Sequence, residues 1–343
     1  MSILFRADAG VDIGSGHLMR CLGLAQYLRD QGAFCSLLTT GVEEPVVARW
    51  REEEIDVQEH QARRGSPEDA TATLAAAAAA GAQWIVADGY DFGLDWQRAA
   101  KEGGVGLLCF DDLGGASFAA DLVVNQNPGA QDLSYDMEGD GRVLAGADYV
   151  VLRRDIRRLK REASSQPPHL LVTFGGYDGD NLALAAMREL AGVETPFAAT
   201  VICSADADGL AEAQTFAASH PDRFRVLPPT DIAPLMAVAD LVLCAGGTMS
   251  LETASLGIPM VLVTVADNQE PGAAALAGAG CARLAGSGVE ALPDAAKILC
   301  DLMPDAAACK DMGRAGIVLV DGEGVARISA AMAGDRPMRE HHG

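Results

Sequence analysis

The sequence predicts an α/β protein made of two doubly wound domains. Short apolar runs alternate with helical stretches in the first half of the chain, and the same alternation restarts in the second half. A polar and basic stretch, RRDIRRLKREASSQPP at residues 153–168, separates the halves. Such alternation is typical of parallel sheets covered by helices, so each half reads as a Rossmann-like domain. We expect the active site in the interdomain cleft, outside the carboxyl ends of the strands.

Five apolar runs predict the strands of the first domain, which we expect to span residues 1–153. They lie at residues 3–5, 34–40, 84–88, 106–112 and 122–127. Helical periodicity predicts the intervening helices, at residues 17–31, 43–54, 70–80 and 96–102. We expect residues 154–168 to form a linker.

The second domain is expected to span residues 169–323. Its predicted strands lie at residues 170–176, 197–203, 224–228, 241–247 and 260–265. Its predicted helices lie at residues 182–190, 209–219, 232–237 and 249–255. A C-terminal helix over 324–334 is expected to cross back to the first domain, and residues 335–343 are expected to be a disordered tail.

Charge and cysteine content narrow the classes of partner. A formal net charge of -22 repels nucleic-acid backbones and acidic membranes, so neither is an expected partner. The eight cysteines are scattered, without a CxxC pair or a Cys/His cluster, which predicts reduced thiols in the cytoplasm and no metal site. The N-terminal MSILFRAD reads as a strand and not as a signal peptide. We expect no cofactor.

The loop after the first strand leads to the most specific candidate for a catalytic residue. In DIGSGHLMRC, Gly14 and Gly16 allow a sharp turn before a helix that His17 begins. The GxGxxG pattern is absent and no acidic residue ends the second strand, which disfavours NAD. His17 is either a surface histidine at a helix start or a catalytic base. A helix N-terminus disfavours the imidazolium, so we expect a neutral ring.

Two glycine loops end strands of the second half. Gly175 and Gly176 end one strand, whereas Gly246 and Gly247 end another, before Thr248, which can cap the next helix. Either loop alone is commonly a turn, but as a pair they suit a diphosphate held by peptide N–H groups. Glu252, one helical turn after Thr248, is either a ribose ligand or part of a solvated helix face.

Polar residues also follow the strands at several other points. A single such residue is usually a turn residue, but several at strand ends suit the recognition of a sugar. They are Asp88, Tyr90, Asp111, Asp112, Asn125, Gln126, Asn268 and Gln269. No DxD pair with metal spacing accompanies them, so a divalent ion is not required.

With these residues in hand, the chain resembles the UDP-sugar hydrolases of pseudaminic acid biosynthesis. The similar segments follow one another along nearly the whole chain, and IGSGHLMRC is the most specific of them. The others include ADGYD, DLVVNQN, LVTFGGYDGDN, ADLVLCAGGTMSLETASLGIP and VDGEGVARI. The chain is also similar to the C-terminal half of the lipid II N-acetylglucosaminyltransferase. The resemblance implies a GT-B fold with a UDP-binding second domain.

The resemblance implies hydrolysis of UDP-2,4-diacetamido-2,4,6-trideoxy-β-L-altropyranose to UDP and the free sugar, by inverting attack of water without a metal. His17 would activate or position water. Tyr90 and Asn268 match positions that line the sugar pocket. From their places in the loops and at strand ends, we expect the sugar also to be bound by Gly14, Gly16, Asp88, Asn125 and Gln269. The UDP would be bound by Gly175, Gly176, Ile232, Gly247, Thr248 and Glu252. One departure is Leu251, where many relatives have tryptophan.

Three alternatives to this hydrolase remain at this point. The chain could be a glycosyltransferase that uses a UDP-sugar donor, although no exposed apolar or basic patch suited to a lipid acceptor is evident. It could also be a related UDP-sugar hydrolase of nonulosonic acid biosynthesis, or a sugar-nucleotide sensor without activity. We expect a cytoplasmic monomer that takes only the small-molecule substrate and water as partners.

Overall fold

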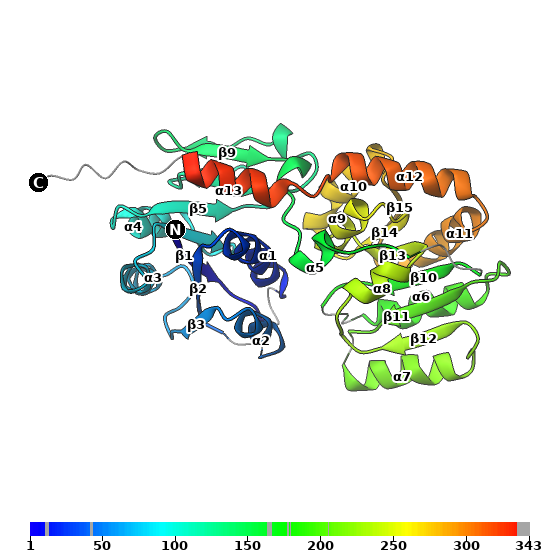
Figure 1. The fold of residues 1–343 in the computed structure, drawn as a ribbon. Coiled ribbons are helices and arrows are strands. Elements are labelled where there is room, and N and C mark those ends of the chain that lie inside the picture. Colours follow the sequence, from blue (N-terminus) through cyan, green and yellow to red (C-terminus); the bar gives the residue numbers. More distant parts are fainter. Residues whose placement is uncertain are drawn as a thin grey trace, which may run out of the picture. The chain divides into compact units, whose positions relative to one another are not determined.

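The structure is a computed structural model that describes residues 1–10, 14–41, 44–162, 167–176, 178, 180–204 and 206–334. The chain divides into two compact units, of which unit 1 is Met1–Arg154 with Gly322–Gly343 and unit 2 is Asp155–Asp321. Each unit is built around its own parallel sheet (Figure 1). The tail expected at residues 335–343 lies outside the described residues.

The sheet of unit 1 has seven strands in the order β3-β2-β1-β4-β5-β7-β9, with all neighbours parallel. The chain thus starts in the middle of the sheet and winds outward in both directions. The strands are β1 (Ser2–Ala7), β2 (Phe34–Thr39), β3 (Asp56–Glu59), β4 (Trp84–Asp88), β5 (Gly106–Phe110), β7 (Leu122–Asn125) and β9 (Arg142–Ala145). Two short strands, β6 (Ser117–Phe118) and β8 (Asp136–Met137), form a separate parallel sheet.

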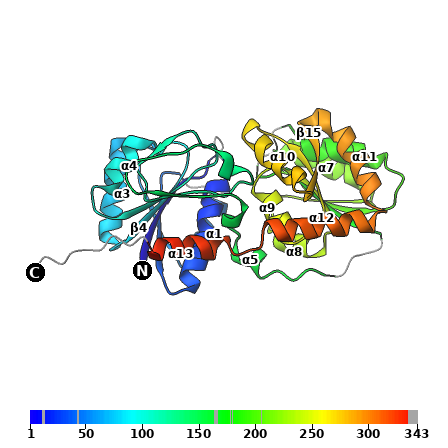
Figure 2. The ribbon, with the colours of Figure 1, turned by 90° about the horizontal axis from the view of Figure 1, so that it is seen from above.

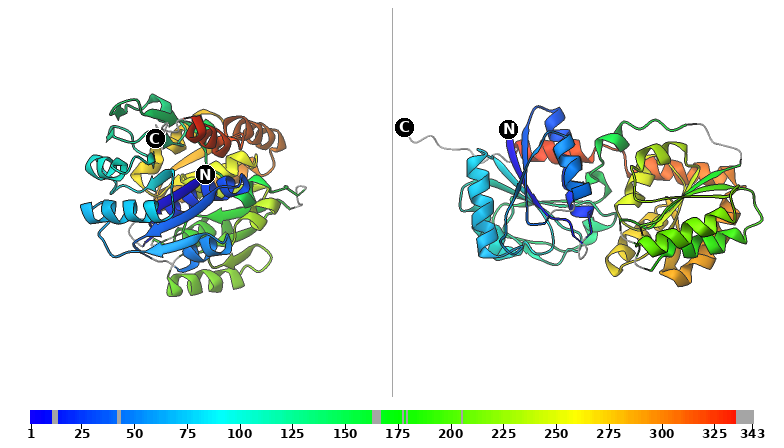
Figure 3. Two further views of the ribbon diagram at one scale, coloured as in Figure 1. Left: turned by 60° about the vertical axis from the view of Figure 1, so that its left-hand side comes forward. Right: turned by 90° about the horizontal axis from the view of Figure 1, so that it is seen from below.

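Helices cover both faces of this sheet (Figure 3). Ile3 and Phe5 of β1 pack into the core under α1 (Gly16–Asp30), α2 (Glu44–Glu52) and α13 (Gly324–Gly334). Leu4, between them, packs into the opposite core under α3 (Pro67–Ala79) and α4 (Leu94–Lys101). Successive side chains of a strand point to opposite faces, so a strand covered on both sides is apolar throughout. Shorter elements are η1 (Ala130–Asp132), η2 (Ala147–Tyr149) and α5 (Arg154–Arg157).

The sheet of unit 2 has six parallel strands in the order β12-β11-β10-β13-β14-β15. They are β10 (His169–Thr173), β11 (Ala198–Ile202), β12 (Phe224–Leu227), β13 (Leu241–Ala245), β14 (Met260–Thr264) and β15 (Ala282–Ser287). Figure 2 shows α7 (Ala207–Ala218) and α11 (Leu292–Leu302) on one side of this sheet, with α8 (Ala233–Val238) and α9 (Thr248–Ser255) on the other. The remaining helices are α6 (Leu182–Ala191), η3 (Asp267–Gln269), α10 (Glu270–Gly278), η4 (Val289–Ala291) and α12 (Ala306–Leu319).

The predicted class, α/β with two Rossmann-like doubly wound sheets, is confirmed. Sequence analysis missed the edge strands β3 and β9, because a half-exposed edge strand needs no continuous apolar run. It also missed the elements between residues 266 and 319. There, alanine and glycine dominate the run GAAALAGAGCARLAGSG, and these small residues give little apolar contrast between the faces of α10 and β15.

Candidate active site

A histidine–aspartate pair lies at the carboxyl end of the central strands of unit 1. His17 is the second residue of α1, and Asp88 is the last residue of β4. The Nδ1 atom of His17 lies 2.7 Å from Oδ1 of Asp88, and both side chains are buried. An ionised carboxylate only accepts hydrogen bonds, so Nδ1 donates, and in the neutral ring Nε2 carries the lone pair. The ring is therefore oriented as a general base requires, and it is not the surface histidine considered as the alternative.

The pKa of His17 is shifted in the direction opposite to the one expected. Burial lowers the pKa of His17, but the Asp88 carboxylate outweighs this effect and the pKa rises above its ordinary value. The helix N-terminus was expected to favour the neutral ring, and the sequence did not show the contact with Asp88. Burial also opposes ionisation of Asp88, yet Arg20 and then His17 lower its pKa to about 2. The carboxylate therefore stays ionised near neutral pH.

Arg20, one helical turn after His17, bridges two carboxylates at the carboxyl ends of the neighbouring strands β4 and β5. Its Nε lies 2.8 Å from Oδ2 of Asp88, and its Nη2 lies 2.7 Å from Oδ1 of Asp88. Its Nη1 donates to Asp112 at 2.6 Å, and its guanidinium lies 4.7 Å from the centre of the Phe110 ring. Sequence analysis assigned no role to Arg20. The available signal was its spacing of three from His17, which places both side chains on one face of α1.

Tyr90 lies beside His17 at the surface. Its ring meets the imidazole edge-on, with 4.9 Å between ring centres, and its side chain is 54% exposed. Its hydroxyl lies 3.5 Å from Oδ2 of Asp112. Together His17 and Tyr90 line a small hollow, whose wall also includes Asp8 and Asp91. The structure thus brings Asp88, Tyr90 and His17 to one place. Contact of these residues with a sugar remains a prediction.

Asn125, predicted to bind the sugar, is wholly buried. Its Nδ2 donates to Asp111 at 3.0 Å, and its Oδ1 accepts from the backbone N–H of Asn127 at 3.1 Å. The neighbouring Gln126 accepts from the backbone N–H of Val151 at 2.9 Å. These amides hold the loops after β5 and β7 in place. A direct contact between Asn125 and a sugar remains a prediction.

The two loop glycines before His17 are exposed. Gly14 has φ +68, in the left-handed region that favours glycine, and its N–H donates to the carbonyl of Gly10 at 2.7 Å. Gly16 begins α1, and a Cβ at either glycine would meet no atom within 4 Å. Their backbone is therefore open to a ligand.

In unit 2, three loops follow adjacent strands. Gly175 and Gly176 follow β10, Gly246 and Gly247 follow β13, and η3 follows β14 with Asn268 and Gln269. Since β10, β13 and β14 are neighbours and parallel, the three loops lie at one edge of the sheet. A Cβ placed on Gly247 would lie 3.7 Å from Nε2 of Gln269, so these two loops are in contact range.

The N-terminus of α9 lies in this loop cluster. Thr248 is its first residue, no side chain caps the helix, and the first turn contains no acidic residue. The peptide N–H groups and the positive end of the helix suit a phosphate. Glu252, further along α9, is only 5% exposed, so the solvated helix face considered for it is wrong. Ile232 is the residue that precedes α8, and its carbonyl accepts from Leu235 and Met236.

Within the described ranges, no group of three or more histidine, cysteine or acidic side chains is arranged to hold a metal ion. All eight cysteines are free thiols. Among the helices of the described residues, none has the length and apolar character needed to span a membrane.

Comparison with known proteins found no matching family model. A UDP-2,4-diacetamido-2,4,6-trideoxy-β-L-altropyranose hydrolase of Campylobacter jejuni is 25% identical over 280 residues, which cover 81% of this chain and 96% of that protein. The spore coat polysaccharide biosynthesis protein SpsG of Bacillus subtilis is 26% identical over 66% of this chain and 68% of its own length. An uncharacterized protein of Methanocaldococcus jannaschii is 25% identical over 77% of this chain, but the match spans only 55% of that protein. The resemblance to the hydrolases is thus confirmed.

Solved structures with the same fold cover nearly the whole chain. MurG of Acinetobacter baumannii has a TM-score of 0.68 at 19% identity and covers 97% of this chain and 99% of its own. The UDP-GlcNAc 2-epimerase of Neisseria meningitidis, bound to UDP-GlcNAc, has a TM-score of 0.65 at 11% identity and covers 98% of this chain and 100% of its own. The fold is therefore GT-B, as the resemblance implied.

Proposed function

We propose that the protein is a UDP-sugar hydrolase that cleaves UDP-2,4-diacetamido-2,4,6-trideoxy-β-L-altropyranose to UDP and the free sugar. The observation that carries the proposal is the His17–Asp88 pair, which leaves Nε2 of a buried imidazole as a proton acceptor beside an exposed tyrosine. The similarity to the Campylobacter jejuni enzyme supports the choice of substrate. The reaction is a step of pseudaminic acid biosynthesis, which we place in the cytoplasm, and the protein acts as a monomer.

The proposed step is attack of water on the anomeric carbon with inversion. Nε2 of His17 takes a proton from the water as the new C–O bond forms, while the bond from the anomeric carbon to the diphosphate oxygen breaks and UDP leaves with the electron pair. Asp88 stabilises the imidazolium that results. A general base of this kind contributes about 10²–10⁴-fold to the rate. No metal takes part, because UDP is already a stable leaving group.

Unit 2 would bind the UDP. Gly175, Gly176, Gly247 and Thr248 would hold the diphosphate through peptide N–H groups and the N-terminus of α9. Glu252 would bind the ribose, and the backbone of Ile232 would meet the uracil. Donors placed where charge develops on a leaving group stabilise the transition state. Peptide dipoles do this without cationic side chains, which suits a chain of net charge -22.

In unit 1, Gly14, Gly16 and Tyr90 are exposed beside His17 and would contact the sugar. Asn268 and Gln269 of unit 2 would add polar contacts to it. Asp88 takes a different part from the one expected at first. Its oxygens are bonded to His17 and Arg20, so we propose that it orients the base and does not touch the sugar.

A glycosyltransferase remains the second candidate, because the MurG structure has the same fold. The deciding experiment incubates the purified protein with the UDP-sugar in H₂¹⁸O without any acceptor. We expect UDP by ³¹P NMR, free sugar of inverted anomeric configuration by ¹H NMR, and ¹⁸O on the anomeric carbon by mass spectrometry. UDP released only after an acceptor is added would identify a transferase. Tight binding of an intact UDP-sugar under all conditions would identify a sensor.

A further inference from the structure

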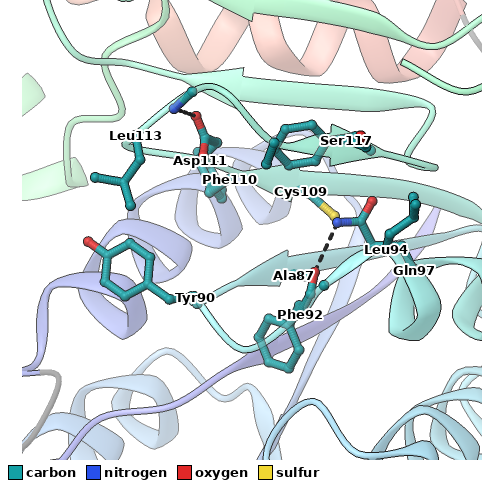
Figure 4. A pocket seen from close by; sticks show the side chains of 15 residues that line it. Ala87, Tyr90, Phe92, Leu94, Gln97, Cys109, Phe110, Asp111, Leu113 and Ser117 are labelled. Atoms are coloured by element: carbon teal, nitrogen blue, oxygen red, sulfur yellow. Dashed lines mark hydrogen bonds between the residues drawn. The ribbon is translucent and has the colours of Figure 1, made fainter. Parts of the chain in front are cut away.

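A second, larger pocket opens next to the hollow at His17. It has a volume of about 470 Å³ and lies at the carboxyl ends of β4 and β5, on the face of the sheet that α3 and α4 cover. Ala87, Phe92, Cys109 and Phe118 form its apolar wall, and all four belong to the core on that face. Figure 4 shows Tyr90 and Leu113 at one end and Leu94 at the other. Tyr90 and Leu113 are 54% and 56% exposed, so this end is open to solvent.

The pocket adjoins the candidate active site. Gly89, Tyr90 and Phe92 line both the pocket and the hollow at His17. The Tyr90 ring therefore stands between the imidazole and the pocket. A substituent of a sugar bound at His17 would have to pass the Tyr90 ring to enter the pocket.

Asp111 is the one charged residue among the described residues that line the pocket. Its Oδ2 accepts from the N–H of Gly114 at 2.8 Å and from Asn125 at 3.0 Å. Within the described chain its Oδ1 has no hydrogen-bond partner. An amide N–H is the neutral group that such an oxygen accepts, whereas an anionic group would be repelled.

Resting on the proposed function, we infer that this pocket receives an N-acyl arm of the sugar and accepts neutral acyl chains longer than acetyl. The amide N–H donates to Asp111, and the acyl chain packs against Phe92 and Phe118. The size of the pocket supports the longer chain. An acetamido group has four heavy atoms, and a single water needs about 10–15 Å³ of such volume, so four waters need about 40–60 Å³. A pocket of about 470 Å³ leaves room for several more carbons.

The test measures binding and turnover separately. Free diamino sugars with N-acetyl, N-butanoyl or N-succinyl groups are titrated into the protein by NMR, and the corresponding UDP-sugars are assayed for UDP release. Each buried methylene strengthens binding about fourfold. We therefore expect butanoyl to bind about 15-fold more tightly than acetyl. Succinyl carries a carboxylate and should bind more weakly than butanoyl.

Two phenylalanine variants test whether the preference for butanoyl arises in this pocket. Ala116→Phe fills the pocket from its exposed rim, and Ala211→Phe places the same side chain at an exposed position of α7 as a control. The butanoyl preference should disappear in the first variant and persist in the second. Asp111→Asn should weaken binding of the acetyl and butanoyl sugars, because their amide N–H loses a charged acceptor. It should also narrow the gap between succinyl and butanoyl, because the repelling charge is removed.

Equal or weaker binding of butanoyl to the unmodified protein overturns the inference, whatever the variants do. The same preference in both phenylalanine variants overturns it as well. If the butanoyl preference is found and is lost in Ala116→Phe, the pocket assignment stands. In that case, failure to release UDP from any UDP-sugar would refute only the proposed hydrolysis. UDP release without any effect of chain length would refute only the pocket assignment.

Discussion

Nδ1 of His17 and Oδ1 of Asp88 are 2.7 Å apart, although 71 positions separate the two residues in the sequence. The contact follows from the pairing of β1 with β4, in which Ala7 lies opposite Asp88. The helix that begins after β1 carries the histidine, and the end of β4 carries the carboxylate. The proposed base and the carboxylate that orients it are thus held by two central elements of one unit, α1 and β4.

Replacing His17 with glutamine should abolish most of the turnover. The amide keeps a polar side chain at the position but cannot accept the proton of water, so we expect kcat to fall about 100-fold or more. UDP affinity, measured by calorimetry, should stay within about twofold, since the loops proposed to bind the diphosphate belong to unit 2. His220→Gln, two residues after the end of α7, is the matched control and should keep full activity. Undiminished UDP release by the His17 variant would refute its role as the base.

Arg20→Lys should lower kcat while changing KM little. A lysine ammonium has no planar fork and cannot hold Asp88 and Asp112 together as the guanidinium does. We expect a fall in kcat of about tenfold, because His17 loses its fixed orientation. An effect on thermal stability alone, with kcat unchanged at a temperature where the variant is folded, would assign Arg20 a purely structural role.

Asp88→Asn should move the pH dependence of the rate. The base must be neutral, so the rate rises with pH through the pKa of His17 and then levels off. The Asp88 carboxylate raises this pKa, and its removal should shift the rising limb to lower pH and lower the plateau. NMR titration of the His17 ring protons gives the same shift without any substrate. If the rising limb of the pH–rate profile does not shift in Asp88→Asn, a group other than His17 controls the pH dependence.

The free energy of unfolding should depend on the ionisation of Asp88 at low pH and of His17 at higher pH. The pKa of Asp88 falls from 3.8 to about 2 on folding, so its ionised form stabilises the fold by about 2 kcal/mol above pH 4. This contribution is lost as the pH falls from about 4 to about 2. The pKa of His17 is raised, so its contribution is present below the ordinary value of 6.5 and is lost as the pH rises through the folded pKa. Urea unfolding of the protein and of the His17→Gln variant across this range measures both effects.

Gly247→Ala should weaken UDP binding without destabilising the fold. A Cβ at this position meets only the end of the Gln269 side chain, at 3.7 Å, so the free protein accommodates it. A phosphate against the Gly247 backbone would be displaced by the methyl group, and overpacking of this kind costs about 1–3 kcal/mol, or roughly 5–150-fold in affinity. Gly278→Ala, where a Cβ would meet no atom within 4 Å, is the control. Unchanged UDP affinity in Gly247→Ala would show that this loop does not contact the bound UDP.

Local patterns in the sequence predicted much of the fold. Buried strands such as β4 and β13 are short apolar runs, because both faces of a parallel sheet are covered by helices. Glycines before a helix also pointed to the loops at Gly16 and Gly247. The edge strands and the alanine-rich helices of unit 2 were missed, since their side chains carry no strong contrast between buried and exposed positions.

The sequence by itself determined the class of the fold, the strand-end loops and the choice of His17 as the candidate base. Only the tertiary structure decided what surrounds that base. Sheet pairing brings Asp88 to Nδ1 of His17, and this carboxylate raises the pKa of His17, which a helix start alone would lower. The same pairing lets Arg20 bridge Asp88 and Asp112. It also buries Asn125 and Glu252 instead of exposing them. Electrostatic interactions depend on distance in space and on burial, and neither follows from separation along the chain.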